Sequence, residues 1–218
     1  MKKIALVLAG GKGERIGGNK PFKYLKGKPL IFWALKPYLE LNLPIWISLR
    51  DSAQKKEIIT LLSSLSLPIK DFDFLLDSPL YKGMGPISGL YSAMVKASKD
   101  TIFIVSAVDQ PFILKEAVEY LLFLGEIFLN FSIVFIKEDA PEPFPGVYPS
   151  SLLHELKEFL EKNKSKSMKG FLHFLLKKNL LVFSDFWHKI DFKGYLFYNI
   201  NTIEELKEAE ACFFQEKI

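Results

Sequence analysis

The 218-residue sequence contains little cysteine and histidine, and each shortage excludes a class of site. Its one cysteine, Cys212, rules out an internal disulfide and a cysteine-rich metal site, as is typical of a protein from a reducing cytoplasm. The histidines, His154, His173 and His188, lack the spacing of a shared metal site. The order Gly-x-Ser-x-Gly of serine hydrolases is missing as well. These absences argue against cysteine, zinc and serine-hydrolase chemistry.

The sequence also lacks a block of one charge and a long uninterrupted apolar segment. Its 29 Lys and Arg residues are scattered among 25 Asp and Glu residues, so we expect neither a nucleic-acid nor a membrane partner. Polar residues interrupt the apolar stretch 118–136, which favours a helix and a strand over a membrane span. The short run 4–9 leads into glycines and charge, which favours a first strand over a signal peptide. We predict one cytoplasmic domain, residues 1–218.

Hydrophobic periodicity predicts alternating strands and helices. This alternation is typical of an α/β protein with three layers, α/β/α, around a mostly parallel, Rossmann-like sheet. Three prolines and three acids in the segment 137–146 predict a loop there. The expected strands are Ile4–Ala9, Ile45–Leu49, Phe72–Leu76, Thr101–Val105, Ser132–Ile136, Leu180–Phe183 and Tyr195–Ile200. The expected helices begin near Leu30, Ala53, Ile87, Lys115, Ser150 or Ser151, Ser167 and Thr202.

A glycine-rich loop follows the first predicted strand, with five glycines among residues 10–18. Glycines leave backbone N–H groups accessible and permit positive φ, and Lys12, Arg15 and Lys20 add positive charge, so the loop is suited to binding phosphate. A Walker-type loop is excluded because Asn19 and Pro21 flank the closing lysine. The dinucleotide fingerprint is weakened but not excluded, because its third glycine falls one residue late.

Polar residues follow three other predicted strands, at the sheet edge where α/β proteins bind ligands. Asp109 lies in the sequence Asp109-Gln110-Pro111 just beyond an apolar strand, and it suits either a Mg²⁺ ligand or a helix cap. The residues alone do not decide between these two roles. Asp77 ends another strand and by itself is typical of a turn. Ser48-Leu49-Arg50-Asp51 follows the second strand.

Several of these segments together resemble one enzyme family. The pattern Leu8-Ala9-Gly10-Gly11-x-x-x-Arg15-Ile16-Gly17-x-x-Lys20 resembles nucleotidyltransferases, most closely the molybdenum cofactor guanylyltransferases. Asp109-Gln110-Pro111, the segment 85–90 and the ending 199–206 resemble further motifs of this family. The resemblance extends from Ile4 to Leu206 and implies a fold of the nucleotide-diphospho-sugar transferase type.

The resemblance implies that GMP passes from GTP to the terminal phosphate of molybdopterin, with Mg²⁺ as cofactor. It implies that Asp109 binds the metal and that Lys20, Arg15 and Asp109 act in catalysis. Molybdenum cofactor assembly proteins or apo-molybdoenzymes are the implied further partners. The implied GTP-binding residues are Leu8, Ala9, Gly10, Gly11, Lys20, Asp77 and Asp109, and those on the acceptor side are Gly85, Pro86, Asn199 and Asn201.

One segment departs from the family pattern. The family carries an asparagine after the second strand, where this sequence reads Ser48-Leu49-Arg50-Asp51, and Arg50 or Ser48 is the candidate replacement. Three other functions stay open: a related transferase using CTP and another phosphorylated acceptor, a non-catalytic GTP-binding assembly protein, and a dinucleotide-dependent oxidoreductase. The last would need an acid such as Asp51 to hold a ribose.

Overall fold

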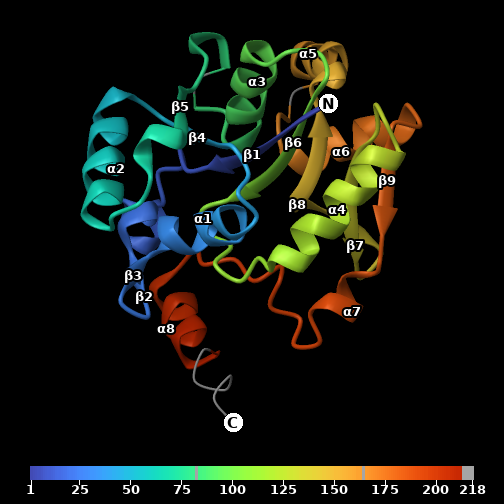
Figure 1. The fold of residues 1–218 in the computed structure, drawn as a ribbon. Coiled ribbons are helices and arrows are strands. Elements are labelled where there is room, and N and C mark those ends of the chain that lie inside the picture. Colours follow the sequence, from blue (N-terminus) through green and yellow to red (C-terminus); the bar gives the residue numbers. More distant parts are fainter. Residues whose placement is uncertain (82, 164, 213–218) are drawn as a thin grey trace.

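Strand β1 (Lys2–Leu8) lies near the middle of a seven-stranded sheet, because its residues are apolar on both faces. The structure, a computed structural model, describes residues 1–81, 83–163 and 165–212 (Figure 1). Ala5 and Val7 point into one hydrophobic core and Ile4, Leu6 and Leu8 into the other. Such burial on both faces is characteristic of a central strand in a parallel sheet covered by helices.

The sheet order is β5-β4-β1-β6-β8-β7-β9, and the first four of these strands run parallel. Their carboxyl ends therefore meet at one edge of the sheet. The predicted three-layer, mostly parallel architecture is confirmed. The strand bounds are β4 (Ile45–Leu49), β5 (Phe72–Leu76), β6 (Thr101–Ala107), β7 (Ser132–Lys137), β8 (Ala140–Pro149) and β9 (Leu181–Ser184), with a separate hairpin of β2 (Tyr24–Leu25) and β3 (Lys28–Pro29).

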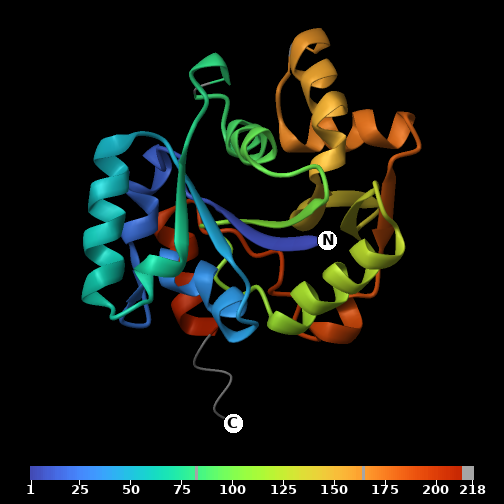
Figure 2. The same cartoon turned by 45° about the horizontal axis from the view of Figure 1, so that its top comes forward.

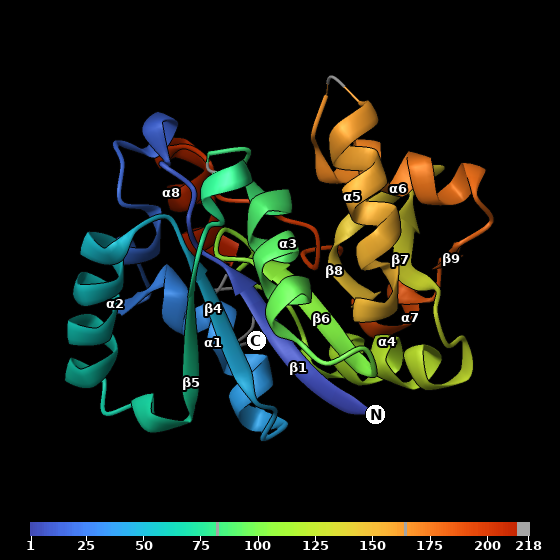
Figure 3. The same ribbon diagram turned by 90° about the horizontal axis from the view of Figure 1, so that it is seen from above.

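Helices cover both faces of the sheet (Figure 3). Helices α1 (Leu30–Glu40), α2 (Ser52–Ser64) and α4 (Lys115–Ile127) pack on one core. Helices α3 (Pro86–Lys96), α5 (Leu153–Lys162) and α6 (Met168–Lys177) pack on the other. In Figure 2, α2 (cyan) and the α5–α6 pair (orange) lie toward opposite edges of the sheet. Among the described residues, every helix is too short or too polar to cross a bilayer.

A third, smaller hydrophobic cluster packs against the glycine loop. It joins Ile16 of that loop, Leu25 of the β2–β3 hairpin and Ala209 of α8 (Ile203–Cys212). Figure 1 shows α8 (red) beside the hairpin. Because Ile16 is fully buried in this cluster, the glycine loop is anchored to the protein at its midpoint. The short helix α7 (Trp187–Ile190) lies near α4.

Strand β8 occupies most of the segment 137–146, so the loop predicted there is wrong. The strand pairs antiparallel with β6 and β7. Its register against β7 shifts, so that Glu142 lies opposite Phe135 and Gly146 opposite Val134. Pro143 and Pro145 fall in this bulge, where a residue without an N–H group costs no ladder hydrogen bond. The prolines therefore mark an irregularity within a strand rather than a loop.

The strand predicted at 195–200 is also wrong, since this segment is irregular with one turn at residues 196 and 197. Its backbone N–H groups find acceptors outside a ladder: Leu196 donates to the Asp191 carboxylate at 2.6 Å, and Ile200 donates to the Asp109 carbonyl at 2.9 Å. Leu196 and Phe197 are both buried although they are adjacent, which is incompatible with a strand that has one apolar face.

Candidate functional site

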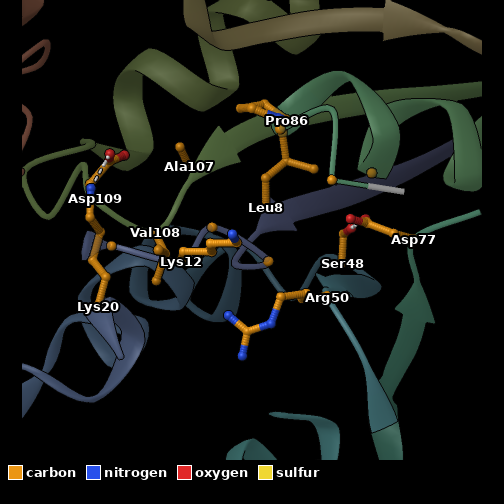
Figure 4. Close-up of a pocket in the computed structure, with 16 residues that line it drawn as sticks. Leu8, Lys12, Lys20, Ser48, Arg50, Asp77, Pro86, Ala107, Val108 and Asp109 are labelled. Carbon is orange, nitrogen blue, oxygen red and sulfur yellow. Dashed lines mark hydrogen bonds and ion pairs between the residues drawn. The ribbon is translucent and has the colours of Figure 1, made fainter. Parts of the chain in front are cut away.

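A cavity of about 370 Å³ opens where the parallel strands end, on the edge that sequence analysis indicated (Figure 4). Lys20 and Asp109 lie on one side of it, and Ser48, Arg50 and Asp77 lie on the other. Leu8 and Pro86 form an apolar wall between them. Of the residues predicted from sequence, those that line the cavity are Leu8, Gly10, Gly11, Lys20, Asp77, Gly85, Pro86 and Asp109.

Lys20 joins two segments that are distant in sequence. Its Nζ donates to Asp109 Oδ2 at 2.9 Å and to Asn201 Oδ1 at 2.8 Å, across 89 and 181 residues respectively. The Lys20 side chain is 13% exposed and that of Asp109 20%, so water screens the pair only partly. An ammonium group has three N–H donors, and these contacts engage two of them. The third is suited to a phosphate oxygen.

The backbone of the glycine loop sets the position of Lys20. The Gly13 carbonyl accepts from the Ile16 and Gly18 N–H groups at 3.1 and 2.8 Å, which closes the loop on itself. Gly13 has a φ of +65°, and a Cβ at this position would lie 2.9 Å from Lys20 Cβ. Only glycine permits both this conformation and this approach. Lys20 then begins a short 3₁₀ turn, Lys20–Phe22, in which Pro21 is buried.

A capping box fixes Asn201 beside Lys20. Glu205 Oε2 accepts from the backbone N–H of Thr202 at 2.9 Å, and the Glu205 N–H donates to Thr202 Oγ1 at 3.1 Å. The Asn201 N–H donates to the same Glu205 carboxylate. These hydrogen bonds form a capping box at the start of α8, and it also orients a site residue. Asn199, by contrast, is exposed and lines neither cavity described here.

Arg15 lines a second cavity of about 480 Å³ that adjoins the first at Lys12, Gly13 and Lys20. Asn201 also lines this second cavity. Ala9 is fully buried behind the glycine loop, with its carbonyl accepting from Gln54 Nε2 at 2.8 Å. Arg15, Asn201 and Ala9, all predicted from the sequence, therefore border the site but do not line the main cavity.

Gln54 is a site residue that sequence analysis missed. It is 4% exposed, and its side chain joins two strand ends: Nε2 donates to the Ala9 carbonyl, while Oε1 accepts from the Arg50 N–H at 2.8 Å. A glutamine in the first turn of a helix gives no local signal of this role. Asp51 caps the same helix by accepting from the Gln54 N–H at 2.8 Å. This hydrogen bond, and then the contact with Arg50, lowers the pKa of Asp51.

Gly89 of α3 allows the helix to approach the sheet beside the cavity. A Cβ here would lie 2.4 Å from Ser48 Oγ and 2.6 Å from Leu8 Cδ2. We expect Gly89→Ala to destabilise the protein by about 1–3 kcal/mol, because the core has no room for the methyl group. Urea unfolding tests this. Gly11→Ala is the control, since nothing lies within 4 Å of its Cβ position. Equal unfolding midpoints for the two variants would contradict the expectation.

The donor set fits one divalent metal ion held by a single carboxylate. Asp109 Oδ1 is buried and has no hydrogen-bond partner, whereas Oδ2 accepts from Lys20. Among the described residues, no group of three His, Cys, Asp or Glu side chains could form a cage around a metal. Mg²⁺ commonly binds through one or two carboxylates and takes its other ligands from water and substrate phosphates. Asp109 is suited to that arrangement.

Comparisons with known proteins agree with this geometry. Residues 5–177 match the MobA-like NTP transferase domain family. A probable molybdenum cofactor guanylyltransferase of Methanocaldococcus jannaschii is 30% identical over 213 residues, which cover 94% of this chain and 97% of the relative. One from Clostridium perfringens is 31% identical over 214 residues, 95% of this chain and 96% of the relative.

Solved structures agree in fold. Molybdopterin-guanine dinucleotide biosynthesis protein A from Archaeoglobus fulgidus superposes with a TM-score of 0.77 at 30% identity, covering 98% of this chain and 99% of that one. A 4-diphosphocytidyl-2C-methyl-D-erythritol synthase from Anaerococcus prevotii has a TM-score of 0.70 at 12% identity, covering 98% and 96%. At 12% identity, the similarity to the synthase from Anaerococcus prevotii supports the fold and nothing further.

Proposed function

This chain belongs to the MobA-like NTP transferase domain family, and from that premise we propose that it transfers GMP from GTP to the terminal phosphate of molybdopterin. The products are molybdopterin guanine dinucleotide and pyrophosphate. The observation that carries the proposal is the contact of Lys20 with Asp109 and Asn201, beside a glycine loop and inside a cavity. The relatives named above, similar over nearly their whole length, support the same assignment.

The reaction needs no nucleophile from the protein. An oxygen of the acceptor phosphate forms a bond to the α-phosphorus of GTP, and the bond from that phosphorus to the bridging oxygen of pyrophosphate breaks. Pyrophosphate leaves with the electron pair. Catalysis of such a transfer consists of positioning and charge stabilisation. Lys20, Arg15 and the N–H groups of Gly10 and Gly11 are the groups of this chain that we assign to the phosphates.

We assign Asp109 as the residue that holds Mg²⁺. When bound there, the ion would neutralise charge on the triphosphate. Asp77 and Leu8 belong to the nucleotide side of the cavity, whereas Gly85, Pro86, Asn199 and Asn201 are assigned to the acceptor side. The dinucleotide product requires a receiving protein, and an apo-molybdoenzyme is the partner class that this activity implies.

Calorimetric titration of GTP, CTP, ATP and NAD, with and without Mg²⁺, tests the nucleotide. We expect selective, magnesium-dependent binding of GTP, followed by molybdopterin-dependent release of pyrophosphate. Preference for CTP would instead indicate a related transferase with another acceptor. GTP binding without pyrophosphate release in the presence of molybdopterin would indicate a non-catalytic assembly protein. Binding of NAD alone would contradict the phosphate-binding role of the glycine loop in this reaction.

A further inference from the structure

The side chain of Gln54 occupies a place where a parallel sheet normally has a backbone hydrogen bond. β1 and β4 pair with Leu8 opposite Ser48, and the Ala9 N–H donates to the Ser48 carbonyl at 2.9 Å. In this register the next bond of the ladder would join the Arg50 N–H to the Ala9 carbonyl. The Gln54 amide takes both groups instead, since Nε2 donates to the Ala9 carbonyl and Oε1 accepts from the Arg50 N–H, each at 2.8 Å.

The strand pairs on either side make the equivalent bond directly. Between β1 and β6, the Val108 N–H donates to the Leu8 carbonyl at 3.1 Å. Between β4 and β5, the Asp77 N–H donates to the Leu49 carbonyl at 3.1 Å. At the β1–β4 pair, two hydrogen bonds and an amide stand in for one hydrogen bond. Gln54 therefore holds these two strands apart at the point where the glycine loop leaves the sheet.

A planar peptide group connects the Ala9 carbonyl to the cavity. The peptide bond between Ala9 and Gly10 is trans, so the Gly10 N–H points opposite to the Ala9 carbonyl. The carbonyl faces Gln54 and β4, and the N–H therefore faces the β6 side of β1. Gly10 lines the main cavity together with Val108 and Asp109, which follow β6. Among the described residues no backbone carbonyl accepts from the Gly10 N–H, which leaves this donor to a ligand.

Close packing limits how far this peptide group can turn. A Cβ on Gly10 would lie 3.1 Å from the Arg50 nitrogen and 3.4 Å from the Leu49 carbonyl carbon, so Gly10 packs on the backbone at the end of β4. Gln54 itself is 4% exposed, and its N–H donates to the Asp51 carboxylate at 2.8 Å. The amide that holds the Ala9 carbonyl is thus fixed by its own helix.

We propose that Gln54 is a positioning residue for phosphate binding, which holds the Ala9 carbonyl so that the Gly10 N–H is aimed at a phosphate oxygen in the main cavity. Glutamine is suited to this role because its amide carries both a donor and an acceptor, as a peptide group does. The inference rests on the proposed function, in that it takes the glycine loop as the element that binds the phosphates.

NMR spectroscopy of the Gly10 amide tests the direction of its N–H and needs no substitution. Ala9-Gly10 is the only Ala-Gly pair in the sequence, so labelling with carbonyl-¹³C alanine and ¹⁵N glycine selects the signal of this one amide. We expect saturation with tripolyphosphate, followed by calorimetry, to move the Gly10 amide proton downfield, because a phosphate oxygen becomes its acceptor. An unmoved signal in protein that has bound tripolyphosphate would overturn the proposal.

Gln54→Met tests the role of the amide, since methionine has a similar length but lacks the donor and the acceptor. We expect this variant to bind tripolyphosphate and GTP about 10- to 100-fold more weakly, as for loss of a hydrogen bond to a charged group, and to show a smaller shift of the Gly10 proton. Leu62→Ala is the matched control, because Leu62 is fully buried in the core about two turns further along α2. It should lower the melting temperature and keep the wild-type affinity.

The possible failures are distinguishable. If Gln54→Met and Leu62→Ala lose affinity in proportion to their melting temperatures, Gln54 acts through stability alone and the proposal is overturned. Wild-type affinity in Gln54→Met would overturn it as well. If the wild-type protein binds neither tripolyphosphate nor GTP, the proposed function fails and this inference fails with it. Binding of GTP by the wild type with an unmoved Gly10 signal would contradict this inference alone.

Discussion

Lys20→Ala is expected to lower kcat/KM for GMP transfer by about 10²–10³-fold, as is common when an electrostatic catalytic group is removed. The Lys20 ammonium touches Asp109 and Asn201 within 3 Å and has one N–H left for the substrate. This position is suited to stabilising negative charge on the phosphates of a bound nucleotide. Among the described residues, Lys20 is the cation that hydrogen-bonds to both Asp109 and Asn201.

The measurement is steady-state release of pyrophosphate with GTP and molybdopterin as substrates. Lys23→Ala is the matched control, since Lys23 follows the same short turn but lines neither cavity. We expect near-normal activity from the control. Circular dichroism and thermal unfolding should show that the fold of Lys20→Ala is intact. Activity within a few-fold of wild type in Lys20→Ala would remove Lys20 from the catalytic groups.

Sequence reasoning located this site because the parallel sheet brings distant segments together. Lys20 and Asp109 are 89 residues apart, and no local pattern connects them. Each follows a strand that runs parallel to its neighbour, so both belong to one edge of the sheet. The alternation of strands and helices was thus enough to predict their proximity.

The residues that sequence reasoning missed act through tertiary contacts. Gln54 lies in a helix that shows nothing unusual, and its role follows only from its hydrogen bonds to Ala9 and Arg50. Gly89 lines the cavity and also lets Ser48 and Leu8 of the sheet approach the helix closely, which the sequence does not show. Both residues owe their roles to contacts with residues of other helices, strands or loops, and the periodicity of a sequence does not reveal such contacts.

The two incorrect elements share a cause. Prolines at 143 and 145 opposed a strand, yet the ladder bulges at those residues. The mainly apolar and aromatic residues at 195–200 favoured a strand, yet the Asp191 carboxylate and the Asp109 carbonyl accept hydrogen bonds from N–H groups there. In each case hydrogen-bond partners supplied by the tertiary structure outweighed local propensity. The segment 195–200 then leads directly to Asn201, so its irregular path helps to place a site residue.

Asp109→Asn is expected to abolish the dependence of GTP affinity on Mg²⁺ and to lower kcat/KM by about 10²–10³-fold. Asparagine has the same shape and can still accept from Lys20, but it lacks the negative charge that a divalent cation requires of its one protein ligand. The buried Oδ1, which has no hydrogen-bond partner, is the atom that we assign to the metal. Comparison with Asp109→Ala separates the charge from the hydrogen bond to Lys20.

Calorimetry with GTP at several Mg²⁺ concentrations measures the first effect without relying on activity. Asp71→Asn, at an exposed aspartate outside both cavities, is the control and should keep the wild-type dependence on Mg²⁺. Undiminished magnesium dependence in Asp109→Asn would place the metal ligand elsewhere.

The double variant Lys20→Ala/Asp109→Asn tests whether the two side chains act together in catalysis. Because Lys20 and Asp109 are in direct contact, their effects on kcat/KM should not add, and the double variant should lose less than the product of the two single losses. Strict additivity would mean that the two side chains act independently. In that event the Lys20–Asp109 contact would contribute to folding, and the catalytic role of each residue would have to be assigned separately.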